Sequence, residues 1–311
     1  MPVYKSVLEC IGNTPLVELC KISPADGARI LLKVESLNPG GSIKARTALA
    51  IIEEAERQGR IKPGDTIVEA SSGNQGISLA MIGAAKGYKV IICLPENMSM
   101  ERRKVLSAYG AELVLTPVGK DIKETLEICL DTVQRILREH PGAFWASQFD
   151  NPANLDAHYG STARELLEDL GNNIHAFVAG IGTGGTITGV GKKLKEVIPS
   201  AQIVAVEPDK APLLSGGEFG HHCQEGIGDG IMPGILDPQV IDRVELVSDA
   251  EAVEMARRLA KEEGIFCGVS TGTTVCGAVR VARGLPKDSV VVAIMADGGE
   301  KYLSTQLCRD E

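Results

Sequence analysis

The chain has 311 residues, of which 44% are hydrophobic and 23% are charged, a balance that is ordinary for a soluble globular protein. Its 32 basic and 41 acidic residues leave a formal net charge of −9, and no basic run is present, so nucleic acid and anionic membrane surfaces are disfavoured as partners. A chain of this length has room for two domains.

Two further features concern the compartment. The N-terminal residues MPVYKSVLEC lack the charged start and hydrophobic block of a secretion signal, and no apolar stretch approaches the length of a membrane span. The eight cysteines are scattered, with no C-x-x-C pair and no histidine at the spacing of zinc ligands. We therefore expect a cytoplasmic protein with reduced thiols and no metal site.

The first half of the chain alternates between strand and helix patterns. Two apolar runs at 15–19 and 30–35, separated by a polar turn, predict a hairpin or an adjacent strand pair. Helical spacing of apolar residues then extends from Ser42 to Gly59. Further strands are expected at 66–70, 89–94, 112–116 and 144–146, and further helices ending near 87, around 100–109 and from about 120 to 139. This alternation predicts a parallel sheet covered on both faces.

A second series of the same kind follows. Helices are expected around 157–169, through 197, and at about 249–263 and 273–283, with strands at 175–180, 202–207 and 289–295 and an irregular segment at 213–234. The two series predict two open-sheet α/β domains, at residues 1–147 and 148–311, with residues 14–35 able to pack with the second. No low-complexity linker separates them, so we expect a site in the cleft between closely packed domains.

Residues 38–46, NPGGSIKAR, place Lys44 in the first turn of a predicted helix. The N-terminal end of a helix carries partial positive charge, which disfavours an ammonium group by up to about 1 kcal/mol. The neutral amine gains accordingly, and only a free amine attacks a carbonyl in Schiff-base chemistry. The alternative is an ordinary solvated lysine.

Residues 180–186, GIGTGGT, follow an apolar strand and open a helix. Glycines let the backbone approach an anion, and exposed N–H groups with the helix dipole then bind it, so phosphate is a natural ligand. The same glycines satisfy G-x-G-x-x-G, and Glu207 ends the next strand near the place of a ribose-binding acid. Taken alone, this segment favours a dinucleotide, and a structural glycine turn is a further alternative.

Two other strand-to-helix turns are rich in polar groups. Residues 71–76, SSGNQG, offer hydroxyls, amides and N–H groups that suit a small carboxylate. Ser270 and Thr271 offer a neutral hydroxyl that could hydrogen-bond a ring nitrogen. Helix capping is the alternative at both places, because Ser, Thr and Asn are favoured capping residues.

Together, these segments resemble those of the cysteine synthase (O-acetylserine sulfhydrylase) and cystathionine β-synthase family. The resemblance runs in order over nearly the whole chain and also includes 148–154 (QFDNPAN), 226–228 (GIG) and 297–305 (DGGEKYLST). It implies a fold-type II, tryptophan-synthase-β-like α/β fold, pyridoxal 5′-phosphate as cofactor, and a homodimer. The leading expectation is cysteine synthase activity, in which O-acetyl-L-serine and sulfide give L-cysteine and acetate, with a dinucleotide-dependent oxidoreductase as a distant alternative.

The resemblance also implies roles for individual residues. Lys44 would hold the cofactor as a Schiff base and later move the substrate α-proton. Asn74 would bind the cofactor's 3′-oxygen, and Ser270 would face its ring nitrogen, leaving that nitrogen largely unprotonated. The cofactor phosphate is expected on Gly182, Thr183, Gly184, Gly185 and Thr186, and the amino-acid substrate on Ser71, Ser72, Gly73, Gln75, Gln148 and Gly228.

The sequence departs from the family pattern at three places. Ala45 stands in a segment that is commonly S-V-K-D-R, Gln75 replaces the usual threonine of S-G-N-T-G, and Asp229 interrupts the usual G-I-G-A-G. Asp229 would recognise the ammonium of an amino-acid nucleophile or activate water as a base, or else cap a turn between two glycines. The first two roles favour the alternative activity, a cysteine hydroxyl-lyase or cystathionine β-synthase-type reaction that releases hydrogen sulfide.

Overall fold

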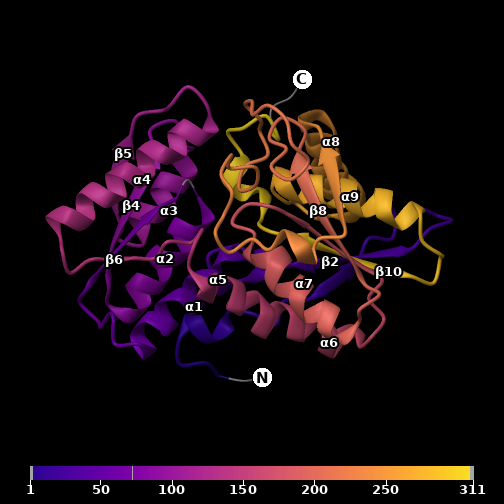
Figure 1. Cartoon of the computed structure of the whole chain (residues 1–311), viewed down its shortest axis with the longest axis horizontal. Helices are drawn as coiled ribbons and strands as arrows, with labels where there is room; N and C mark the ends of the chain where they lie inside the picture. Colours follow the sequence, from indigo (N-terminus) through magenta and orange to yellow (C-terminus); the bar gives the residue numbers. More distant parts are fainter. Residues whose placement is uncertain (1–2, 72, 309–311) are drawn as a thin grey trace.

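The computed structural model describes residues 3–71 and 73–308. Ser72, which was predicted to contact the substrate, lies outside the described residues. The described strands form a four-stranded sheet and a six-stranded sheet, which occupy the left and right halves of Figure 1. The resulting α/β architecture has helices on both faces of each sheet.

The four-stranded sheet has the order β5-β4-β3-β6, and its strands are parallel. Ile67 and Ile92 pack on one face with α1 and α2, whereas Val68 and Cys93 pack on the other with α4. Successive side chains of a strand point to opposite faces, so apolar residues at consecutive positions bury both. The elements are β3 (Thr66–Ala70), β4 (Lys89–Pro95), β5 (Glu112–Thr116), β6 (Phe144–Trp145), α1 (Lys44–Arg57), α2 (Asn74–Lys86), α3 (Met100–Ala108) and α4 (Ile122–Glu139).

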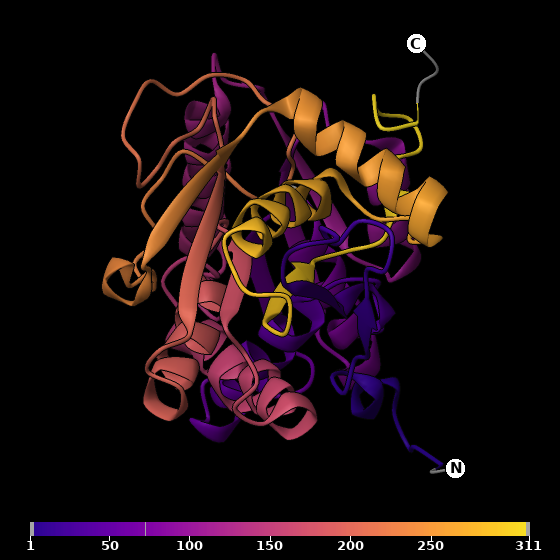
Figure 2. The same ribbon diagram turned by 90° about the vertical axis from the view of Figure 1, so that its right-hand side faces the viewer.

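The six-stranded sheet has the order β1-β2-β10-β7-β8-β9. Its first two strands form the predicted antiparallel pair, β2 then pairs with β10, and every pairing except β1 with β2 is parallel. Ile203 faces α6 and α7, whereas Val204 faces α8 and α9, which are prominent in Figure 2. The elements are β1 (Leu16–Glu18), β2 (Arg29–Val34), β7 (Ala176–Gly180), β8 (Gln202–Pro208), β9 (Arg243–Val247), β10 (Val290–Met295), α5 (Pro152–Ala157), α6 (Ala163–Leu170), α7 (Gly185–Val197), α8 (Asp249–Glu263) and α9 (Val269–Arg283).

Three elements differ from their predicted form. Strand β9 was not predicted, because the short sequence RVELV alternates polar and apolar residues and lies at a sheet edge, where it is only partly buried. The helix predicted around 157–169 begins earlier, at Pro152, and passes through a π-helical turn, η3 (His158–Thr162), before α6. Helix α9 begins four residues before its predicted start, which puts Ser270 in its first turn.

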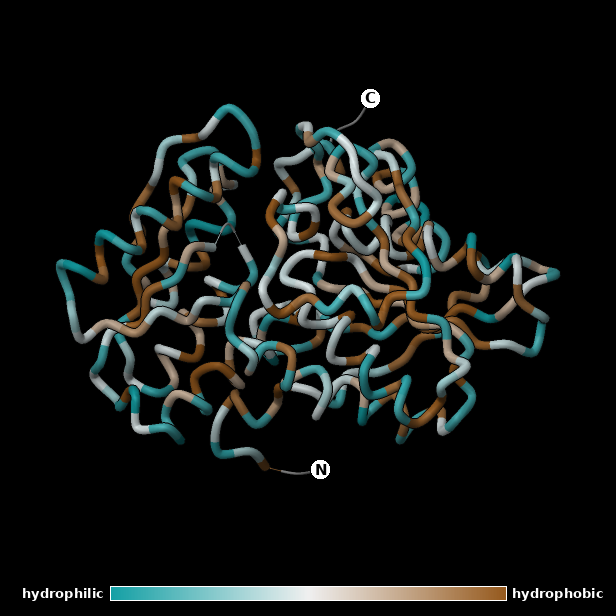
Figure 3. The backbone as a smooth tube through the Cα atoms, in the orientation of Figure 1, coloured by the Kyte–Doolittle hydropathy of each residue, from teal (hydrophilic) through white to brown (hydrophobic). Residues whose placement is uncertain are grey.

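The hydrophobic segments run through the interior of both halves in Figure 3. All eight cysteines lie in the described residues and are free, and four of them are buried. Among the described helices, none combines the length and apolar character needed to cross a bilayer. The division of the chain into domains at residues 147 and 148 stays a prediction, and residues 16–34 contribute strands to the six-stranded sheet.

Candidate active site

One pocket brings together predicted residues from both halves of the chain. Gly185 and Gly228 were predicted to belong to the site, but they lie beside lining residues and do not line the pocket themselves. The predicted residues that do line it are Lys44, Ser71, Gly73, Asn74, Gln75, Gln148, Gly182, Thr183, Gly184, Thr186, Asp229 and Ser270.

Lys44 is the first residue of α1 and borders the pocket. The preceding backbone is tied to the end of β10, because Ser42 pairs with Asp297 and the Ile43 N–H donates to the Ala296 carbonyl oxygen at 2.8 Å. Burial lowers the pKa of Lys44, although attraction to Asp229 and Asp297 opposes the shift. This direction agrees with the predicted one, and burial is its main cause.

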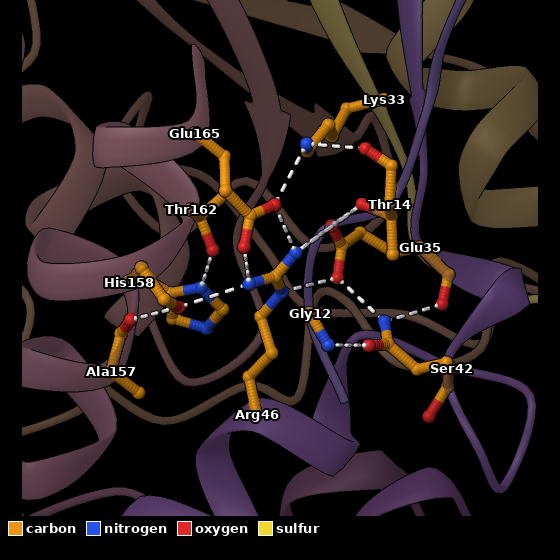
Figure 4. Close-up of polar contacts among 12 residues, drawn as sticks. Gly12, Thr14, Lys33, Glu35, Ser42, Arg46, Ala157, His158, Thr162 and Glu165 are labelled. Atoms are coloured by element: carbon orange, nitrogen blue, oxygen red, sulfur yellow. Dashed lines mark hydrogen bonds and ion pairs between the residues drawn. The ribbon is translucent and has the colours of Figure 1, made fainter. Parts of the chain in front are cut away.

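The first turn of α1 is also held by a buried ionic network, shown in Figure 4. The guanidinium of Arg46 lies between two carboxylates, with shortest nitrogen–oxygen distances of 2.7 Å to Glu35 and 2.6 Å to Glu165. Lys33 in β2 lies 2.8 Å from Glu165, so two positive and two negative groups balance. These contacts connect the helix that carries Lys44 to the six-stranded sheet, through strand β2 and the residue that follows it, and to helix α6, which packs on that sheet.

The glycine loop between β7 and α7 has no room for side chains at two positions. A Cβ atom on Gly182 would collide with the Gly226 carbonyl oxygen, and one on Gly185 would collide with the side-chain oxygen of Asn154. The Asn154 amide also donates to the Thr183 hydroxyl at 2.9 Å, which fixes the loop. The backbone N–H groups at the start of α7 are thus held beside the pocket, an arrangement that fits a phosphate.

Glu207 does not have the environment of a ribose-binding residue. Its side chain is buried, and its carboxylate accepts hydrogen bonds from the Leu214 N–H at 2.7 Å and the Ser215 hydroxyl at 3.1 Å. The carboxylate therefore stabilises the loop that follows β8, and the geometric support for a dinucleotide is lost.

The polar loop after β3 combines a structural hydroxyl with an unsatisfied amide. The Ser71 hydroxyl accepts the Gly76 N–H at 3.0 Å, so it caps the start of α2 while also lining the pocket. Gln75 is 1% exposed, and its two amide atoms have no hydrogen-bond partner among the described residues. A buried polar group without a partner costs about 1–3 kcal/mol, so a polar ligand at this place would be stabilising.

Asn74 connects this loop to the segment after β10. Its amide donates to Asp297 at 2.8 Å, and its carbonyl oxygen accepts from Lys301 at 2.7 Å. The Tyr302 hydroxyl donates to the same Asp297 carboxylate at 2.8 Å. Asn74 is therefore held in a defined orientation where it borders the pocket.

Two charged residues of the pocket were not predicted. Arg102 from α3 forms an ion pair with Glu225, a residue of the loop that precedes Gly226, and its guanidinium lies 4.9 Å from the centre of the Tyr302 ring. The pair joins the two halves of the molecule across the pocket. No local signal could have identified Arg102, because MERRK reads as an ordinary surface helix.

The described residues fit pyridoxal phosphate. A lysine amine with a lowered pKa, an anion-binding loop and an unsatisfied amide share one pocket, and these are the groups that an aldehyde, a phosphate and a substrate carboxylate require. The sequence family of pyridoxal-phosphate dependent enzymes matches residues 7–297. The chain belongs to this family, and it is a pyridoxal-phosphate-dependent enzyme.

Individual relatives cover nearly the whole chain. A cysteine synthase of Staphylococcus aureus (strain N315) is 48% identical over 303 residues, 97% of this chain and 96% of the relative. A crystal structure of O-ureido-L-serine synthase is 43% identical, with a TM-score of 0.93 over 98% of this chain and 95% of that one. A hydrogen sulfide-producing enzyme from Fusobacterium nucleatum is 41% identical, with a TM-score of 0.89 over 97% and 99% of the two chains.

These likenesses confirm the predicted fold-type II α/β architecture, the predicted cofactor and the predicted family. They also remove the oxidoreductase alternative, whose acidic residue Glu207 is occupied within the protein. The roles of individual site residues stay predictions.

Proposed function

We propose that the protein catalyses β-replacement on a serine-like amino acid and acts as a cysteine synthase, making L-cysteine and acetate from O-acetyl-L-serine and sulfide. The observation that carries this proposal is the placement of the Lys44 amine in one pocket with the glycine loop and the polar loop after β3. The 48% identity to a cysteine synthase over nearly the full length supports the choice of substrates.

Bound pyridoxal phosphate supplies an electron sink that stabilises negative charge at the substrate α-carbon. Lys44 would attach the cofactor covalently and, once released by the substrate, would remove and return the α-proton, for which its lowered pKa suits it. The Gly182–Thr186 backbone would hold the phosphate at the start of α7. Asn74 would bind the 3′-oxygen of the cofactor. Ser270 would offer the ring nitrogen a neutral hydroxyl, which would leave that nitrogen largely unprotonated.

The amino-acid carboxylate binds at the polar loop. Gln75 contributes its free amide N–H groups, and the Gly73 backbone and the Ser71 hydroxyl border the same space. Gln148 also lines the pocket; its amide donates one hydrogen to the Ala70 carbonyl oxygen at 3.3 Å and would offer the other to the carboxylate. Ser72 and Gly228 stay predicted members of this binding site. Binding of the carboxylate by N–H and O–H donors leaves the amine of Lys44 free for chemistry.

The proposal is tested by product analysis. Purified enzyme is incubated with O-acetyl-L-serine and sulfide, and separately with L-cysteine alone, and the products are identified by mass spectrometry. We expect rapid formation of L-cysteine and acetate in the first mixture and slower release of hydrogen sulfide in the second. Formation of no L-cysteine in the first mixture would contradict the assignment.

A second activity is supported by Asp229, whose side chain lines the pocket next to Gly182. Burial raises the pKa of this carboxyl, although electrostatic attraction to Lys44 and His222 opposes the shift. A carboxylate whose pKa is raised is a better base, so it can activate water for the reaction of L-cysteine with water to give L-serine and hydrogen sulfide. The likeness to a hydrogen sulfide-producing enzyme supports this alternative.

The variant Asp229→Asn separates the two activities. The amide keeps the shape of the side chain but cannot accept a proton, so the reactions with water or an amino-acid nucleophile should slow by about 100-fold, the usual scale of general base catalysis. Sulfide needs no base, and its rate should change less than about twofold. Asp229→Asn protein with undiminished activity toward every acceptor would show that Asp229 only shapes a turn.

The homodimer and the cytoplasmic location implied by the resemblance stay predictions. Light scattering on the purified protein measures the mass in solution, and twice the chain mass of 32.9 kDa is the expected result.

A further inference from the structure

His158 lies in a position that connects the lysine helix to the glycine loop. It begins the π-helical turn η3 and is fully buried. Its Nε2 atom lies 3.3 Å from the Thr47 hydroxyl in α1 and 3.2 Å from the Thr186 hydroxyl in α7. Its Nδ1 atom lies 3.0 Å from the Thr162 hydroxyl, a contact visible in Figure 4. π-helical turns are rare and are frequent at functional sites.

The neighbouring hydrogen bonds determine which nitrogen carries the proton. The Thr47 hydroxyl donates its hydrogen to the Asn154 side-chain oxygen at 3.2 Å, so toward His158 it can only accept. Nε2 must therefore be the N–H donor in that contact, and Nδ1 accepts the hydrogen of the Thr162 hydroxyl. Distances of 3.2 and 3.3 Å suit one N–H shared between two oxygens.

The charge state of the ring agrees with this geometry. Burial lowers the pKa of His158 well below its usual range, and the positive charges of Lys44 and Arg46 lower it further, while Glu165 opposes the shift. The ring is thus neutral at physiological pH, with one donor and one acceptor nitrogen. The Nε2–H donates to Thr186, whose own hydrogen is left available for an acceptor in the pocket.

We infer that His158 is a positioning residue that orients the Thr186 hydroxyl toward the cofactor phosphate and aligns the glycine loop with the helix of Lys44. A phosphate accepts hydrogen bonds and donates none when fully ionised, so it needs the Thr186 O–H to point at it. The inference rests on the proposed phosphate role of residues 182–186. It adds a residue outside the pocket lining that decides the direction of one of the hydrogen bonds.

Two substitutions distinguish the ring nitrogens. The amide nitrogen of glutamine can occupy the place of Nε2, whereas that of asparagine can reach only the place of Nδ1. The dissociation constant of pyridoxal phosphate is measured on cofactor-free protein. We expect His158→Asn to weaken binding by about tenfold, the scale of one hydrogen bond to a charged group. His158→Gln should retain most of the affinity, and His140→Asn, at the exposed end of α4, should have no effect.

The same substitution in a Thr186→Val background tests the coupling. With the hydroxyl removed, His158→Asn should cause no further loss of affinity. An equal loss in both backgrounds would show that His158 acts through packing alone and would overturn the inference. If Thr186→Val alone leaves the affinity unchanged, the phosphate role of the loop fails. If Thr186→Val weakens binding but His158→Asn does not, only the role of His158 fails.

Nitrogen-15 NMR of the wild-type holoenzyme, labelled at its histidines, reports which ring nitrogen of His158 carries the proton. His158 is assigned by the signals missing from His158→Gln. We expect the two-bond couplings of an Nε2–H ring, unchanged over neutral pH. An Nδ1–H ring or a charged ring would overturn the inference even if the His158→Asn proteins proved too unstable to measure.

Discussion

Replacing Lys44 by alanine is expected to lower the rate of β-replacement by about a thousandfold or more, because proton transfer by a positioned group alone contributes 10²–10⁴. The variant also loses covalent attachment of the cofactor, which only this amine in the pocket's described lining can form. Steady-state rates with O-acetyl-L-serine and sulfide measure the loss. The Lys287→Ala protein, changed at an exposed lysine, is the control and should keep its rate.

The loss in Lys44→Ala should be chemical and not structural. Alanine has the highest helix propensity, and Lys44 is the first residue of α1, so the fold should be retained. Circular dichroism and thermal unfolding of the cofactor-free proteins check this point. A Lys44→Ala enzyme that turns over within tenfold of the wild-type rate would show that another group performs the proton transfer.

The second large effect is expected on stability. Replacing Arg46 by methionine removes from buried Glu35 the cation that it pairs with and leaves Glu165 with Lys33 alone among the described residues. Removing one partner of a buried ion pair destabilises proteins by about 3–5 kcal/mol. Urea unfolding should show a loss of this size in Arg46→Met, whereas the control Arg138→Met, at an exposed position of α4, should remain within about 0.5 kcal/mol of wild type.

The pH dependence of unfolding adds a specific signature. Burial raises the pKa of Glu165, but hydrogen bonds and charge attraction from Arg46, helped by Lys33, outweigh it and lower the pKa to about 2 from a usual 4.5. A lowered pKa in the folded state contributes stability that is present above pH 4.5 and is lost as the pH falls toward 2. The fall in stability over this window should be shallower in Arg46→Met. Equal stability of variant and wild type at pH 7 would contradict the importance of the network.

Local patterns predicted most of the fold. Apolar runs such as those of β3, β4 and β10 are buried on both faces, and this is why consecutive hydrophobic residues marked them clearly. Strand β9 escaped prediction because its stability comes from pairing with β8 and not from its own RVELV sequence. The π-helical turn at His158 also follows from tertiary contacts, namely the hydroxyl partners in α1 and α7, which no local sequence rule contains.

The candidate site likewise contains residues that local patterns predicted and residues whose position depends on tertiary packing. Glycine loops and polar turns have recognisable local chemistry, so Gly182, Asn74 and Lys44 were predicted from their segments. Arg102 and His158 lie in helical segments whose sequences have no distinctive motif. Their position beside the pocket depends on how helices from distant parts of the chain pack together. The pKa of Lys44 shows the same limit, because the main cause of its shift is burial, which depends on the folded protein and cannot be seen in the local sequence.

The most direct test of the account is to identify the residue that carries the cofactor. Purified holoenzyme should be yellow, and reduction with borohydride should bleach it and fix the cofactor to the protein. Tryptic digestion and mass spectrometry then locate the modified peptide. The account predicts a single adduct on Lys44, and an adduct on any other lysine, or no adduct in protein that turns over O-acetyl-L-serine, would contradict it.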